Sequence, residues 1–144
     1  MVTEEMFDRI KELLSELEEY SDEGVPIVVE GARDEEALRE LNLKGPIFQI
    51  SSSKKTALNF LEDLARYKRV IVFTDFDEAG DELAKFCAKH LRRLGPEPVM
   101  HIREELKSLL RKDIKEVQEL VRFLRNQVNE SGEAKERQGR QHRF

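Results

Sequence analysis

Two apolar runs that each end in carboxylates constrain the fold of this chain most. The runs Val25–Glu30 and Val70–Asp77 are rich in β-branched residues, and each leads through a glycine-containing loop into a helical pattern. Such runs are typical of strands buried inside a parallel sheet. Because ligands bind at the carboxyl ends of the strands in an open parallel sheet, Glu30, Asp75 and Asp77 mark the expected functional edge.

These three carboxylates predict a metal site. Asp75 and Asp77 are two residues apart, so an extended chain directs both side chains to the same side. If the two strands are neighbours, at about 4.8 Å spacing, Glu30 joins them. Either aspartate alone could cap the following helix, but capping would explain only one of the three carboxylates. Clustered carboxylates repel one another unless a proton or a hard cation intervenes, and oxygen ligands suit Mg²⁺, with Mn²⁺ as the alternative. The pattern therefore predicts a magnesium site and chemistry on phosphates.

Strand and helix patterns alternate along the 144 residues, as in a single α/β domain. The expected strands are 25–30, 46–50, 69–74 and 99–102. The expected helices are 3–19, 34–41, 51–67, 79–94 and 103–127, with N-caps at Thr3, Asp34 and Ser51–Ser53 and a break near 111–113. We expect the domain to occupy residues 1–128. Residues 129–144 are expected to form a disordered tail, because Ser, Gly, Gln and charged residues replace apolar ones there.

Composition excludes several classes. The formal net charge of −5 argues against a general nucleic-acid coat, so a nucleic-acid partner would have to meet a local basic patch. No apolar stretch approaches the roughly 20 residues that span a bilayer, and the N-terminus lacks the pattern of a signal peptide. The lone Cys87 excludes a disulfide framework, is expected to be buried, and is consistent with a cytoplasmic location.

Four cations are the candidate contacts for a nucleic-acid backbone: Arg33, Lys54, Lys55 and Arg103. All lie in loops that we expect at the carboxyl edge of the sheet. Serines and lysines at a helix start are a reasonable phosphate contact. A capped helix with solvated lysines explains Ser51–Lys55 equally well, and arginines are more often surface residues than ligands. His101 is expected to be structural.

At these residues the chain resembles the Toprim family. The matching segments are Val28–Gly31, then Asp34 and Leu38, and later Thr74–Gly80, within a region that covers about 26–102. A lone DxD is common. An apolar strand that ends in Glu-Gly, followed 45 residues later by a strand that ends in DxDxxG, is fairly specific. The resemblance implies a Rossmann-like parallel sheet of about four strands with helices on both faces.

The resemblance also implies roles for the acids. Glu30 would act as the general acid or base beside the metal, and Asp75 and Asp77 would bind Mg²⁺, for phosphodiester transfer or hydrolysis of RNA or DNA. The small chain is similar to stand-alone Toprim proteins such as the ribonuclease that matures 5S ribosomal RNA, and to the Toprim domain of primases. It departs from the topoisomerases, because Tyr20 and Tyr67 lie in a turn and at a helix end rather than in a nucleophile region.

Other interpretations fit less well or remain open. A phosphatase of the haloacid dehalogenase type would need Thr where Ala79 stands and Asp where the first strand ends in Glu30. A receiver domain would need a Lys at the last strand, where this chain has His101. The open alternative is a non-catalytic Toprim module that binds nucleic acid or a protein partner in a larger assembly. The acidic net charge and the lack of aromatic stacking platforms favour that module, whereas the retention of all three acids favours an enzyme.

Overall fold

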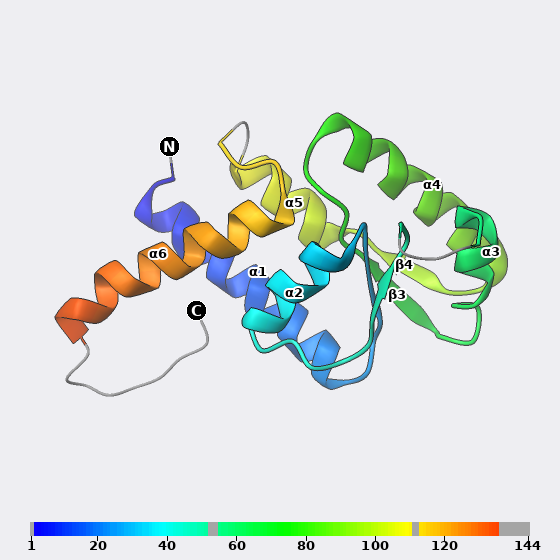
Figure 1. The fold of residues 1–144 in the computed structure, drawn as a ribbon, viewed down its shortest axis with the longest axis horizontal. Helices are drawn as coiled ribbons and strands as arrows, with labels where there is room; N and C mark the ends of the chain where they lie inside the picture. Colours follow the sequence, from blue (N-terminus) through cyan, green and yellow to red (C-terminus); the bar gives the residue numbers. More distant parts are fainter. Residues whose placement is uncertain (1, 52–54, 111–112, 136–144) are drawn as a thin grey trace.

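The computed structural model describes residues 2–51, 55–110 and 113–135 (Figure 1). Its elements are, in chain order, α1 (Glu4–Asp22), β1 (Ile27–Val29), α2 (Ala32–Glu40), β2 (Ile47–Gln49), α3 (Ala57–Glu62), β3 (Arg69–Val72), α4 (Glu78–Leu94), β4 (Glu97–Val99), α5 (His101–Leu110) and α6 (Val117–Lys135). Within the described residues, no helix combines the length and the apolar character needed to cross a membrane.

Four parallel strands form the sheet in the order β2-β1-β3-β4. The strands β1 and β3, which precede the predicted site, are therefore neighbours at its centre, with Ile27 opposite Ile71. Alternate residues of β1 face opposite layers, as the pleat requires. Val28 packs in the cluster with α3 and α4, whereas Ile27 and Val29 pack in the cluster with α1, α2, α5 and α6. The expected α/β fold, with a four-stranded parallel sheet and helices on both faces, is confirmed.

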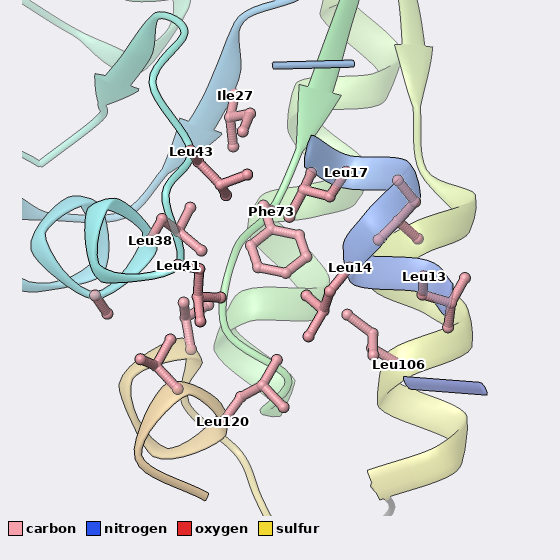
Figure 2. Packing of buried hydrophobic residues seen from close by; sticks show 14 of the residues in the cluster. Leu13, Leu14, Leu17, Ile27, Leu38, Leu41, Leu43, Phe73, Leu106 and Leu120 are labelled. Atoms are coloured by element: carbon pink, nitrogen blue, oxygen red, sulfur yellow. The ribbon is translucent and has the colours of Figure 1, made fainter. Parts of the chain in front are cut away.

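Phe73 lies at the centre of the larger cluster, directly after β3. Figure 2 shows its ring among leucines of four helices: Leu14 and Leu17 of α1, Leu38 of α2, Leu106 of α5 and Leu120 of α6. Each of these side chains is almost fully buried. Burial of so many apolar side chains around one aromatic ring holds the four helices on the same face of the sheet.

Local capping explains where several helices begin. Thr3 caps α1 as expected, since its hydroxyl accepts a hydrogen bond from the Met6 amide at 3.1 Å. The cap of α2 is Gly31 rather than the expected Asp34. The Asp34 carboxylate instead accepts a hydrogen bond from the Gly31 amide at 3.0 Å, which is the role of an acid at the third helical position.

Two elements differ from the sequence expectation. The last strand is Glu97–Val99 rather than 99–102, because the Met100 carbonyl already accepts a helical hydrogen bond from the Glu104 amide. Helix α3 begins at Ala57, where the Thr56 hydroxyl accepts a hydrogen bond from the Asn59 amide, and it ends at Glu62. This helix therefore begins later than expected, and Ser51 does not cap it. Ser51 is described, and its hydroxyl donates to the Glu30 carbonyl; residues 52 and 53 lie outside the described part.

The break between the last two helices is confirmed, since α5 ends at Leu110 and α6 begins at Val117. At the start of α6, the Glu119 carboxylate accepts hydrogen bonds from the two preceding amides of Lys115 and Glu116. Helix α6 continues to Lys135, beyond the expected start of the tail at 129, because extending a packed helix costs little per added residue. Residues 136–144 of the expected tail lie outside the described part.

The burial of α6 leads to a stability prediction. Leu124 is 0% exposed in the main core. Leu124→Ala should therefore lower the free energy of unfolding by about 2–5 kcal/mol in urea titrations. Deletion of residues 130–144, which contain two apolar residues, should change the melting temperature little. A large drop in melting temperature on deletion, or an unchanged free energy of unfolding for Leu124→Ala, would contradict this prediction.

Candidate functional site

Glu30 and Asp75 meet at the carboxyl edge of the sheet. Glu30 directly follows β1, and Asp75 follows β3 on the neighbouring strand. The Asp75 amide donates a hydrogen bond to Glu30 Oε2 at 3.0 Å. Both residues are half-buried, so each carboxylate is partly withdrawn from water while still reachable from it. The parallel pairing of β1 with β3 thus brings together two of the three carboxylates, from segments 45 residues apart.

Asp77 caps the helix that follows the motif. Its Oδ1 accepts a hydrogen bond from the Gly80 amide at 2.7 Å, and Thr74 Oγ1 donates to the Gly80 carbonyl at 2.7 Å. A Cβ atom added at Gly80 would stand 1.9 Å from the Asp75 carbonyl oxygen. Glycine is therefore required at this position by close backbone approach, and it holds the DxDxxG loop folded tightly against its own strand end.

The start of α6 forms part of the same site. The amide of Val117, the first residue of α6, donates to Asp75 Oδ1 at 3.0 Å. Gln118 Nε2 lies 3.3 Å from Asp34 Oδ1, and the Phe76 amide donates to the Lys115 carbonyl at 2.7 Å. Sequence reasoning missed these contacts. The break expected near 111–113 indicated that a new helix starts after it, but no local pattern shows that this start lies against the DxD loop.

Burial and mutual repulsion dominate the electrostatics of the site. Burial, together with repulsion from Asp34, Glu30 and Asp77, raises the pKa of Asp75 to about 7, although the hydrogen bond from Val117 favours the charged form. Glu30, Asp75 and Asp77 each use one carboxylate oxygen for a backbone amide. Within the described residues, no lysine or arginine side chain forms a salt bridge with these three acids.

This set of donors suits a hard cation. Three carboxylates keep a second oxygen beyond their backbone contacts, and the field among them disfavours the fully ionised state. Over the described residues, the side chains do not already form a group of three or more His, Cys, Asp or Glu that could hold a metal ion. The residues present fit Mg²⁺ or Mn²⁺ in their chemistry, and the ligand geometry is not preformed.

The structure corrects the expectation for Arg103. Its side chain is 0% exposed, so it cannot meet a nucleic-acid backbone. Its guanidinium donates instead to the carbonyls of Thr74 (3.1 Å) and Asp75 (2.5 Å) and to the carboxylate of Asp81 (2.7 Å). Burial alone would raise the pKa of Asp81, but the hydrogen bonds from Lys107 and Arg103 outweigh burial and lower it. Arg103 therefore holds the backbone of the DxD loop in place through these hydrogen bonds.

The other predicted cations are dispersed. Arg33 is exposed in the first turn of α2, and Lys55 pairs with Asp63 at 2.5 Å. Lys54 lies outside the described residues. His101 pairs with Glu16 at 2.6 Å, which fits the structural role expected for it. Cys87 is buried as expected, and burial raises the pKa of its thiol to about 12.

Comparison with known proteins identifies the family. The model of the Toprim domain matches residues 25–119, which include every acid of the site and end just inside α6. The chain belongs to the Toprim family. The resemblance expected from the sequence is thereby confirmed, and the Toprim match contains both the Glu-Gly strand end and the DxDxxG loop.

Similar Toprim-type proteins occur in archaea. A UPF0292 protein of Methanosarcina barkeri is 38% identical over 118 residues, which is 81% of each chain. A UPF0292 protein of Thermococcus gammatolerans is 38% identical over 116 residues, covering 81% of this chain and 84% of that protein. A solved structure of an Aquifex aeolicus protein shares the fold, with a TM-score of 0.64 and 22% identity over 76% of this chain and 95% of that one.

The raised pKa of Asp75 leads to a prediction for the metal-free protein. The folded state holds this proton up to pH about 7, whereas the unfolded chain releases it near pH 3.8. Stability therefore falls as pH rises between these values. Asp75→Asn keeps an acceptor for the Val117 amide and removes this titration. In EDTA, the variant should gain stability relative to wild type from pH 5 to pH 8.

A matched control is Asp22→Asn at the exposed end of α1. Thermal melts of this variant should follow the pH profile of wild type. A profile of Asp75→Asn that runs parallel to wild type across the whole range would contradict the electrostatic account of the site.

Proposed function

We propose that this protein binds Mg²⁺, with Mn²⁺ as an alternative, at Glu30, Asp75 and Asp77, and hydrolyses phosphodiester bonds of nucleic acid. Toprim membership associates the chain with metal-dependent processing of nucleic acids. The observation that carries the proposal is the meeting of Glu30 with the DxD loop, with charge repulsion and no salt bridge to a cation among the described residues.

The acids have two tasks in this proposal. Asp75 and Asp77, on one loop, would hold the ion. When bound there, the ion would polarise the phosphate and offset the charge that develops on its oxygens. Glu30 would receive the proton of the attacking water, because one of its oxygens is fixed by the Asp75 amide and the other is left for this task. The hydrogen bond from Val117 to Asp75 keeps that carboxylate oriented toward the same edge.

Metal binding can be tested without any substrate. Mg²⁺ or Mn²⁺ should raise the melting temperature of wild type, because a ligand at 100 times its Kd adds about 2.7 kcal/mol to the free energy of unfolding. The double variant Asp75→Asn with Asp77→Asn keeps both backbone acceptors and should lose this gain. The control double variant Asp8→Asn with Asp22→Asn, on exposed positions of α1, should keep it. Equal stabilisation of wild type and the site variant would refute the metal site.

Turnover is tested with Glu30→Gln, which keeps an acceptor for the Asp75 amide but cannot take a proton. Cleavage of structured RNA and of single- and double-stranded DNA should fall by about 10²–10⁴-fold, whereas binding of the same oligonucleotides should change little. Glu5→Gln, exposed on α1, serves as the control and should cleave like wild type.

The same assays discriminate the alternatives. If wild type binds nucleic acid with Mg²⁺ or Mn²⁺ and cleaves none of it, a non-catalytic binding module replaces the enzyme. If wild type binds no nucleic acid at all, a role in a protein assembly becomes the better account. The acidic net charge of −5 and the burial of Arg103 are the observations that favour these outcomes over cleavage.

A further inference from the structure

A polar groove lies between α2 and α6, beside the acids. Its charged and polar walls consist of Arg33, Glu36 and Glu40 from α2 and Gln118, Arg122 and Arg125 from α6. These positions recur every three or four residues along each helix, so one face of each helix lines the groove. The two helices also pack on each other, and the buried core residues Ala37 and Val121 are the apolar residues that line the groove.

The groove lies next to the candidate metal site in the fold. The N-cap of α2, Gly31, directly follows Glu30, and the first amide of α6 donates to the Asp75 carboxylate. Gln118, at the head of the groove, contacts Asp34, whose carboxylate also accepts a hydrogen bond from the amide of the N-cap residue Gly31. Both walls of the groove therefore have their first residues near Glu30 and Asp75, and they continue along α2 and α6.

Two of the three arginines that line this groove are available to a ligand. Arg33 and Arg122 are exposed, and within the described part of the chain neither forms an ion pair. Arg125 pairs with Glu40 across the groove. This surface thus has two uncommitted guanidinium groups in a protein of net charge −5. Guanidinium groups match phosphate oxygens in geometry and charge, so an anionic polymer is the ligand that this surface fits.

We infer that the groove binds the phosphodiester backbone of the nucleic acid whose cleavage is proposed above. The inference thus rests on the proposed function, and it identifies the surface that would hold the substrate's backbone. From Gln118 to Arg125, α6 rises about 10 Å. Measured along the axis of a duplex, that length spans about three phosphates of one strand. Arg122 and Arg125 follow the Toprim match, which ends at 119, so this wall is supplied by a helix that extends beyond the family domain.

The test measures binding apart from cleavage. Fluorescence anisotropy of labelled RNA and DNA oligonucleotides, with Mg²⁺ and a series of salt concentrations, is recorded for proteins that all carry Glu30→Gln. Adding Arg33→Ala and Arg122→Ala should weaken binding at least about tenfold. On single strands, the slope of log affinity against log salt should fall by about 0.7 for each phosphate that the variant no longer neutralises. The RNA and DNA arms show which backbone is preferred.

Two further variants make the test specific. Glu36→Gln removes a negative charge from the groove wall and should tighten binding, which loss of fold cannot imitate. Arg92→Ala with Arg93→Ala removes the same charge from exposed positions of α4, on the opposite face of the sheet, and should leave affinity unchanged. Melting temperatures confirm that each variant is folded.

The outcomes separate this inference from the proposed function. If the groove variants bind like the parent while Glu30→Gln still abolishes cleavage, the groove is refuted and the enzyme stands. If they lose binding although wild type cleaves nothing, the groove is supported and the protein is a binding module. Equal losses in the α4 control, or no binding of either nucleic acid by the parent, overturn the groove.

Discussion

The buried guanidinium of Arg103 is the interaction on which the arrangement of the site depends. It joins three elements, because it sits on α5, binds the carbonyls at the end of β3, and pairs with Asp81 on α4. Removing one partner of a buried charge pair costs about 3–5 kcal/mol in other proteins. In this protein the buried charge of Arg103 lies against the backbone of the DxD loop. It therefore fixes the backbone that presents Asp75, while its own ion pairs among the described residues are with Asp81 and Glu104.

Helix starts surround the acids, and in the part of the chain that the structure describes no lysine or arginine forms a salt bridge with Glu30, Asp75 or Asp77. The first turns of α2, α4 and α6 all lie at this edge, and each has an amide bonded to Asp34, Asp77 or Asp75. Amides and helix dipoles stabilise negative charge only in part. Burial and the remaining repulsion still raise the pKa of Asp75 to about 7. The fold thus holds the acids in place without neutralising them, and that residual charge is the physical basis for binding a divalent ion.

Sequence reasoning predicted the features that short segments determine alone. The strand ends at Glu30 and Asp75 follow from apolar runs that stop at carboxylates, and the pairing of β1 with β3 was sufficient to join them. The role of Arg103 could not be predicted, because an arginine beside a strand end has the same local pattern whether it is exposed or buried. The place of Val117 also depends on how α6 packs across the chain, 42 residues from Asp75.

Helix α6 couples the core to the site. The side chain of Val117 is 0% exposed in the core, while its amide binds the Asp75 carboxylate. One turn later, Leu120 packs in the cluster around Phe73 (Figure 2). Phe73 lies between β3 and Thr74, directly before the DxDxxG loop. A shift of α6 would therefore move a hydrogen-bond donor of the site and a wall of the groove together. Because packed cores resist small displacements, the distance between acids and groove is set by apolar contacts rather than by the charged residues themselves.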